Sequence, residues 1–133
     1  TLARSLKSNL MFLERYHDLL KPGGKLLTVI DESVLNTEGQ GKSMQKFRKW
    51  LRKKYIVRAV ISLPHNTFVN ADAGVKTSVL YLTKRVSDTE EQPPVFMAIS
   101  KDVGHNDAGR TTSEWGDLGN ILESFKKFQN GDY

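Results

Sequence analysis

The sequence of 133 residues contains no cysteine, which excludes disulfide bonds and thiolate metal sites. Its three histidines, His17, His65 and His105, are far apart in the sequence and therefore predict no metal cluster. No apolar run approaches the roughly 20 residues that a membrane-spanning helix needs, and the N-terminus does not have the layout of a signal peptide. We therefore expect a cytoplasmic protein with no metal site and no membrane partner.

Positive charge is concentrated in the first part of the chain. Residues 1–55 contain 12 Lys and Arg against 5 Asp and Glu, whereas residues 56–133 contain 8 against 10. The excess is densest between residues 42 and 54, where there are seven cations and no acid. A basic helix of this kind can contact the phosphates of DNA, although a solvated helix face also explains the charge. Under the first interpretation, the candidate contacts with the DNA backbone are Lys42, Lys46, Lys49 and Lys53.

The hydrophobic pattern predicts an α/β layer architecture. Apolar residues at helical spacing predict helices over residues 2–20, 43–54 and 118–128. Short apolar runs predict strands over residues 25–30, 56–63, 76–84 and 95–99. The order strand–helix–strand predicts a parallel crossover, and the short loop after the second strand predicts an antiparallel hairpin with the third. Helices packed on so few strands leave sheet edges exposed, so we expect a fragment of a larger domain.

Three local expectations follow from particular residues. The short apolar run at 25–30 is typical of a strand that is buried on both faces. Asp117 directly precedes the last helix, where its carboxylate can cap the helix N-terminus. His17 lies on the apolar stripe of the first helix, which predicts a packed histidine whose ring is satisfied by its neighbours.

Phe68 is a large apolar side chain within a polar loop. The loop covers residues 64–75 and follows a strand, at the edge of an α/β sheet where ligands usually bind. An aromatic ring there can stack on a base that has left the DNA duplex, and such stacking is worth about 1–3 kcal/mol. The ring can also fold back as an anchor of the loop, since isolated apolar residues are common on loops. Chemistry alone favours the anchor.

Several motifs in this chain occur together and in a fixed order. A Leu-Pro-x-x-x-Phe stretch ends at Phe68, and Gly-Val-Lys-Thr-Ser follows at 74–78; a Leu-Leu-Lys-Pro-Gly-Gly turn lies at 19–24. Further matching segments are residues 12–15, 33–35, 47–51, 59–64 and 79–84. Over about residues 10–130 the chain thereby resembles the modification (methyltransferase) subunit of type I restriction–modification systems, within the N6-adenine DNA methylase family.

The resemblance implies a partial Rossmann-like fold of the S-adenosylmethionine-dependent methyltransferases. Residues 1–100 would form the C-terminal half of the catalytic domain, and residues 101–133 a loop and a helix that pack on it or follow it. The implied reaction transfers a methyl group from S-adenosylmethionine to a flipped DNA adenine, with Phe68 packed against that base. The implied partners are DNA and the specificity and restriction subunits of a type I complex.

The family's catalytic and cofactor motifs do not occur in these residues. The chain has no Asn-Pro-Pro-aromatic sequence and no glycine-rich turn at the required place after a strand, and Asp31 stands where the family often has proline. We therefore assign no catalytic, cofactor-binding or metal-binding residue, and we expect the chain alone to be inactive. Two other functions stay open: a Rossmann-like methyltransferase for RNA or protein, and a non-catalytic, basic DNA-binding remnant.

Overall fold

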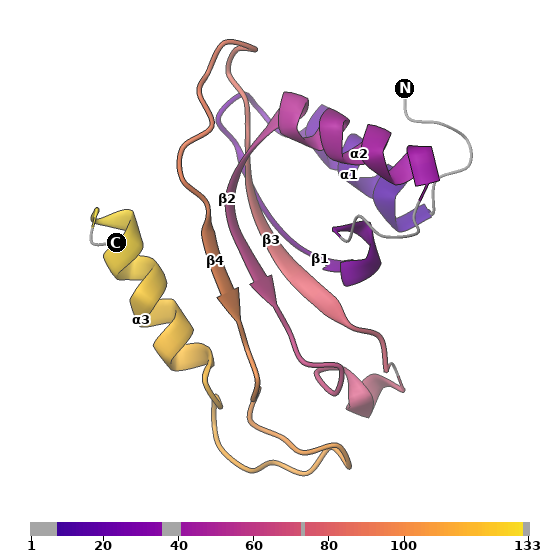
Figure 1. Ribbon diagram of the computed structural model, residues 1–133, viewed down its shortest axis with the longest axis vertical. Helices are drawn as coiled ribbons and strands as arrows, with labels where there is room; N and C mark the ends of the chain where they lie inside the picture. The colour runs from indigo at the N-terminus through magenta and orange to yellow at the C-terminus, as the bar shows by residue number, and fades with distance from the viewer. Residues whose placement is uncertain (1–7, 36–40, 73, 132–133) are drawn as a thin grey trace.

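The computed structural model describes residues 8–35, 41–72 and 74–131 and shows helices packed on a mixed sheet (Figure 1). The elements are α1 (Ser8–Leu19), β1 (Lys25–Asp31), η1 (Glu32–Val34), α2 (Gly41–Lys54), β2 (Tyr55–Ser62), η2 (Val69–Ala71), β3 (Thr77–Lys84), β4 (Phe96–Ile99) and α3 (Leu118–Gln129). Every predicted helix and strand is present, with ends that differ by a few residues. The part of the first helix predicted over residues 2–7 lies outside the described residues.

The strands of the described residues form one sheet in the order β1-β3-β2-β4. β3 is antiparallel to both of its neighbours, and β4 is parallel to β2. The predicted hairpin of β2 and β3 is therefore confirmed. β1 and β2 run in the same direction, as the predicted crossover requires, but they are not neighbours because β3 lies between them.

Helices α1 and α2 cover one face of the sheet and enclose the core with it. Successive residues of a strand point to opposite faces, so alternate residues of β3 are buried beneath these helices. The buried apolar side chains of this core include Leu10, Leu13, Phe47, Leu51, Leu80 and Leu82. The α/β class predicted from the hydrophobic pattern is thus confirmed.

Aromatic side chains pack against one another at the end of this core, where α1, α2 and the start of β2 meet. His17 packs edge-on against Trp50 and Tyr55, with ring centroids 6.3 and 5.4 Å apart. The hydroxyl of the buried Tyr55 donates a hydrogen bond to the backbone oxygen of Leu13 at 2.8 Å, and burial raises the pKa of Tyr55 well above its usual value. His17 is half-buried, and its predicted packing is confirmed by these two ring contacts.

Helix α3 covers part of the opposite face. The ring of Phe125 lies edge-on to Tyr81 of β3 and Phe96 of β4, at centroid distances of 6.0 and 5.3 Å. Phe128 lies 5.5 Å from the ring of Phe96. The helix is therefore attached to the sheet mainly through aromatic contacts with β3 and β4.

The expected cap of α3 is wrong in its details. Asp117 does occupy the N-cap position, but its side chain makes no capping hydrogen bond. Instead, its carboxylate accepts hydrogen bonds from Ser100 Oγ at 2.6 Å and from the backbone N–H of Lys101 at 2.7 Å. The loop before α3 returns to the end of β4. The carboxylate therefore binds donors at the end of that strand, and it does not cap the helix as the sequence predicted.

Strand β1 is exposed on the face that it shares with α3. Leu27 is 68% exposed and Val29 is 47% exposed, whereas Ile30, which points to the other face, is buried. The expectation of burial on both faces is therefore wrong for the described structure. Helix α3 lies beside β4, at the opposite edge of the sheet from β1 (Figure 1), and no described helix covers this side of β1.

Candidate nucleic-acid interface

Phe68 lies in the loop between β2 and β3, just beyond the end of β2. Its side chain is 36% exposed, so the ring is partly covered and partly open to solvent. The backbone around it is fixed by turns: Thr67 N–H donates to the oxygen of Pro64 at 3.1 Å, and Ala71 N–H donates to the oxygen of Phe68 at 2.9 Å. A ring on such a turn can meet a ligand without first leaving the core.

The loop at residues 100–117 holds the Phe68 loop in place. We call the following three hydrogen bonds the loop brace: His105 Nε2–H to the Asn66 backbone oxygen (2.6 Å), Asn66 Nδ2–H to Asp107 Oδ1 (2.9 Å), and Asn70 Nδ2–H to the Gly109 backbone oxygen (3.1 Å). These bonds join residues that are 39 to 41 positions apart in the sequence. Phe68 therefore lies between two asparagines that are both attached to the second loop.

The loop at residues 100–117, which we call the bracing loop, contains a tight turn. Asn106 Oδ1 accepts the backbone N–H groups of Ala108 and Arg110, each at 3.0 Å, and Gly109 N–H donates to the Asn106 backbone oxygen. Gly109 has a φ of +76°, and a Cβ atom on it would lie 1.8 Å from Asn70 Oδ1. Glycine is required there because it accepts a positive φ and because the two loops touch at its Cα.

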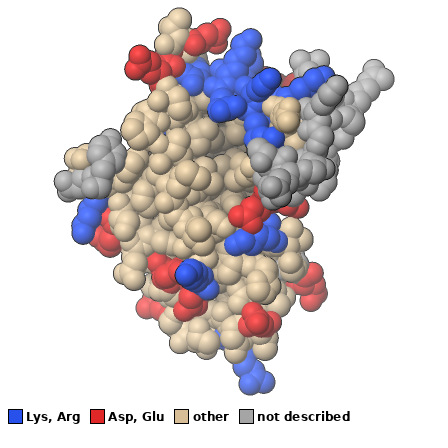
Figure 2. Space-filling model, in the orientation of Figure 1, with Lys and Arg blue, Asp and Glu red and all other residues tan. Residues whose placement is uncertain are grey.

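The basic side chains of α2 lie at the other end of the sheet from Phe68. The exposed cations of this helix are Lys46, Lys49, Arg52 and Lys53, whereas the side chain of Lys42 lies outside the described part of the structure. Figure 2 shows blue side chains gathered at the upper end of the molecule, where α2 lies, and mixed charges at the lower end. Because α2 ends where β2 begins, the structure does not bring these cations and Phe68 together.

The described residues do not fit a bound nucleotide-type cofactor in the bracing loop, although this loop is rich in glycine. Gly104 and Gly116 both have positive φ values. A Cβ on Gly104 would lie 2.7 Å from the oxygen of Ser113, and one on Gly116 would lie 2.0 Å from the oxygen of Asp102. The chain's own backbone thus fills the space that a cofactor-binding glycine leaves open, and we derive no cofactor step from this chain.

Neither a metal centre nor a membrane span is found in the part of the chain that the structure describes. Within it, no three side chains of His, Cys, Asp or Glu gather where they could hold a metal ion. Within the same residues, no helix has the length and apolar character needed to cross a membrane.

Comparison with known proteins shows the family. The family model described as N-6 DNA Methylase matches residues 1–133, which is the whole chain. The chain belongs to the N-6 DNA methylase family. Among curated proteins, none matches it.

Solved structures share the fold of this N-6 DNA methylase chain. The methyltransferase subunit of a type I restriction–modification system from Streptococcus thermophilus has a TM-score of 0.70 and 24% identity; the match covers 95% of this chain and 25% of that one. The EcoKI M protein, a type I restriction enzyme component, has a TM-score of 0.61 and 23% identity, with coverage of 91% and 24%.

A third solved structure, from Listeria monocytogenes, is described as a class I S-adenosylmethionine-dependent methyltransferase. It has a TM-score of 0.65 and 21% identity, with coverage of 96% of this chain and 35% of that one. The chain therefore spans between 24% and 35% of these structures. The predicted Rossmann-like methyltransferase fold is confirmed, as is the resemblance to the modification subunits of type I systems.

Phe68 can be recognised from the sequence, but the residues of the loop brace cannot. The polar run at residues 106–109 is readable as a turn. Nothing local in it indicates that the turn contacts Asn66 and Asn70, because the contact is made across some 40 residues of chain. Only the folded sheet, which brings the ends of β2 and β4 together, creates that contact.

Proposed function

We propose that the intact protein is a DNA adenine-N6 methyltransferase, namely the modification subunit of a type I restriction–modification system. The single observation that carries this proposal is the match of the N-6 DNA methylase model to the whole chain. In the proposal, residues 1–100 are the C-terminal half of the catalytic domain, and residues 101–133 are the loop and helix attached to it. The protein acts in the cytoplasm with S-adenosylmethionine as methyl donor, together with a specificity subunit and a restriction subunit.

Phe68 is proposed to pack against the target adenine after the base has left the duplex. Extruding a base costs a few kcal/mol, and stacking on an aromatic ring offsets about 1–3 kcal/mol of this. The exocyclic amine of adenine is a poor nucleophile, so the base must be held in one orientation for methyl transfer. A partly exposed ring on a braced loop supports this role. No residue of this chain is proposed to act on the methyl group itself.

Contacts of the DNA backbone with Lys42, Lys46, Lys49 and Lys53 form a separate part of the proposal. Strand β2 has eight residues and separates these lysines from Phe68. A strand of that length spans about 26 Å, which corresponds to roughly eight base pairs of duplex. A duplex that lies along the sheet can therefore reach both groups, with the lysines binding phosphates away from the flipped base.

The test compares methyl transfer by the intact protein with that of its Phe68→Ala variant on DNA that contains the recognition site. We expect Phe68→Ala to lower the affinity for the flipped base roughly 5- to 100-fold, whereas Phe68→Trp keeps a stacking ring and most of the activity. Val75→Ala is the matched control, since Val75 is an exposed apolar residue that follows on the same loop. Unchanged turnover and unchanged target-base affinity of Phe68→Ala would refute the role of this ring.

The acceptor is tested in the same assay. Methyl transfer to RNA or protein but not to DNA adenine would replace the proposal with the first alternative, and salt-dependent DNA binding without any transfer would replace it with the second. The purified 133-residue chain is expected not to methylate DNA, because it contains no Asn-Pro-Pro-aromatic sequence and no glycine-rich turn at the required place after a strand. Detectable transfer by that chain would contradict this expectation.

A further inference from the structure

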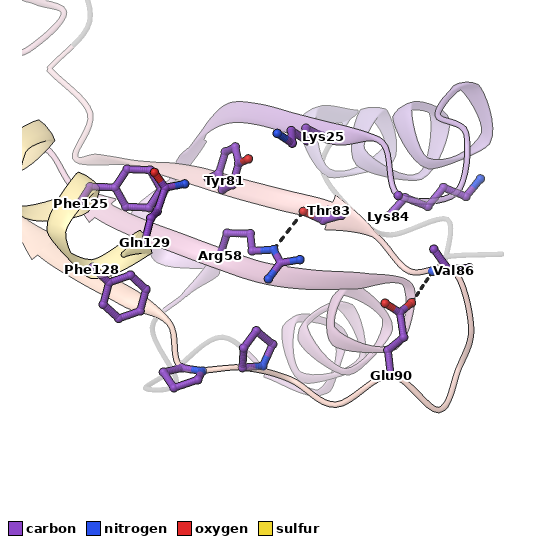
Figure 3. A pocket seen from close by; sticks show the side chains of 13 residues that line it. Lys25, Arg58, Tyr81, Thr83, Lys84, Val86, Glu90, Phe125, Phe128 and Gln129 are labelled. Carbon is purple, nitrogen blue, oxygen red and sulfur yellow. Dashed lines mark hydrogen bonds between the residues drawn. The ribbon is translucent and has the colours of Figure 1, made fainter. Parts of the chain in front are cut away.

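A cavity of about 560 Å³ lies between the sheet and α3 (Figure 3). This volume is within the range of about 300–1,000 Å³ that is usual for small-molecule sites. Lys25, the first residue of β1, and Thr83, near the end of β3, both line it. Phe68 follows the opposite end of β2, so the cavity is separate from the candidate nucleic-acid interface.

Arg58 reaches the cavity from an irregularity in β2. The register of β2 against β3 shifts between Val57 and Ala59, which makes Arg58 the extra residue of a β-bulge. Bulges redirect side chains and occur often beside functional sites. Arg58 Nε donates a hydrogen bond to Thr83 Oγ1 at 3.1 Å (Figure 3). Among the residues that the structure describes, the two terminal nitrogens of this guanidinium make no hydrogen bond or ion pair, although Glu90 lies near enough to interact with Arg58 electrostatically.

The bulge is also fixed on its other side. The side chain of Gln92 accepts the backbone N–H of Val57 at 3.0 Å and donates to the backbone oxygen of Val57 at 2.8 Å. The Gln92 side chain therefore satisfies the backbone N–H and oxygen of Val57, which a neighbouring strand would otherwise bind. Arg58 is held in place before any ligand arrives, which lowers the entropy lost on binding.

The wall around Arg58 is cationic and polar. In Figure 3 the ammonium of Lys25 points towards the hydroxyl of Tyr81, on the same side of the cavity as Arg58. Lys84 also lines the cavity, but its Nζ donates to two backbone oxygens at the end of α1, at 2.7 and 2.9 Å. Lys25 and Arg58 are thus the cations that a ligand can meet.

Among the described lining residues, Glu90 is the only acid. Its carboxylate accepts the backbone N–H groups of Ser87 and Val86, which hold its pKa below the usual value. These bonds turn the carboxylate towards its own turn (Figure 3). The lining therefore has one negative side chain, Glu90, against the two cations Lys25 and Arg58, and its net charge is positive.

A second wall of the cavity is mostly apolar. It is formed by the rings of Phe125 and Phe128 from α3 together with Pro93 and Pro94. The amide of Gln129 lies at the same side and offers both a donor and an acceptor (Figure 3). A planar group with a polar edge fits this wall, because it can lie on an aromatic ring and still form hydrogen bonds.

We propose that this cavity binds a nucleoside phosphate. The phosphate lies on Arg58 and Lys25, since a guanidinium with two unused nitrogens matches two phosphate oxygens at once. The base lies against Phe128, and its polar edge meets Gln129. The proposal does not depend on the methyltransferase function, because none of these residues belongs to the loop brace or to the exposed face of α2.

The test measures binding to the intact protein by isothermal titration calorimetry with adenosine monophosphate, inorganic phosphate and adenosine as separate probes. We expect the monophosphate to bind, and each half of the molecule to bind at least about tenfold more weakly, because either half alone meets only one of the two walls. Arg58→Met is expected to weaken the monophosphate roughly 10- to 100-fold. Lys25→Met is expected to weaken it about threefold; because Lys25 is exposed, this variant is not expected to disturb folding.

The controls are Arg110→Met and Lys127→Met, which remove exposed cations outside the cavity and should leave binding unchanged. No binding of the monophosphate at millimolar concentration, or equal binding by wild type and both cavity variants, overturns the proposal. A single-stranded oligonucleotide that lacks bases separates a free nucleotide from a DNA strand as the source of phosphate. If it binds as tightly as the monophosphate and depends equally on Arg58, the site holds a strand phosphate and the proposal is wrong.

Discussion

His105 donates a hydrogen bond from Nε2 to the backbone oxygen of Asn66, 2.6 Å away and 39 positions earlier in the sequence. With the bonds of Asn66 to Asp107 and of Asn70 to Gly109, it joins the loop after β2 to the loop after β4. The two loops are therefore one unit at this end of the sheet. In the proposed function, the conformation of the ring that meets the base is set by residues that never touch DNA.

His105→Ala is expected to release the Phe68 loop without unfolding the protein. The oxygen of Asn66 loses its partner, so the amides of residues 66–72 should exchange hydrogen faster, while the free energy of unfolding changes by about 1 kcal/mol. Gly109→Ala should act in the same way, because its Cβ would collide with Asn70. The control is His65→Ala, since the side chain of His65 is 73% exposed and lies 4.0 Å from Asp107. Hydrogen exchange as slow as in the wild type would show that the brace does not order the loop.

Much of the fold could be predicted from the sequence because it depends on local patterns. The apolar runs that became β2 and β3 and the polar loop between them specify a hairpin, and the structure has it. The position of β3 between β1 and β2 has no local signal, because it depends on how the hairpin returns to the sheet. The exposed faces of Leu27 and Val29 were missed for a similar reason: an apolar run does not indicate which neighbours are present.

The residues of the candidate site differ in the same way: some have a local signal in the sequence, and others depend on contacts between distant segments. Phe68 could be found because a single aromatic residue in a polar loop is recognisable from the sequence alone. The loop brace could not, since its partners come from a distant turn. Arg58 could not be found either: residues 56–63 read as an unbroken strand, and a bulge shows only when the register against β3 is known.

Protein stability is expected to fall as the pH falls below about 6.5 because of His17. Burial lowers the pKa of His17, and the nearby Lys84 and Lys54 lower it further. The unfolded chain then binds a proton at a pH where the folded chain does not, so stability is full above the unfolded pKa and decreases as the pH falls towards the folded pKa. His17→Phe, which keeps a ring against Trp50 and Tyr55, should flatten this dependence in urea unfolding at pH 5 to 7. His65→Phe is the control, and an unchanged slope for His17→Phe would contradict the argument.

Removal of the exposed lysines of α2 is expected to make DNA binding less dependent on salt. For each phosphate that a lysine no longer neutralises, the slope of log K against log salt concentration should decrease in magnitude by about 0.9. The triple change of Lys46, Lys49 and Lys53 to Gln should therefore lower the magnitude of the slope by up to about 3 units, with little change in sequence preference. A matched triple change of the exposed residues Lys21, Lys101 and Lys127 to Gln serves as the control. Equal slopes for both triple variants would show that α2 is only a solvated face.

Asp117 links the end of β4 to the start of α3, and its charge should stabilise that link. Partial burial alone raises the pKa of Asp117, but hydrogen bonds from Ser100 Oγ and from the backbone N–H of Lys101 outweigh it and lower the pKa overall. A carboxylate with a lowered folded pKa stabilises the protein above its unfolded pKa, and this stability is lost as the pH falls through the folded value.

Asp117→Asn should therefore lower the free energy of unfolding by about 1 kcal/mol at pH 7, and the difference from the wild type should shrink below about pH 4. Urea unfolding at both pH values measures this, with Glu123→Gln as the control, since Glu123 is an exposed acid of α3 that pairs only with Lys126 among the described residues. If the difference in the free energy of unfolding between Asp117→Asn and the wild type stayed constant from pH 7 to pH 3, the charge of Asp117 would not stabilise the link between β4 and α3. The effect of the substitution would then come from the hydrogen-bonding geometry of the side chain alone.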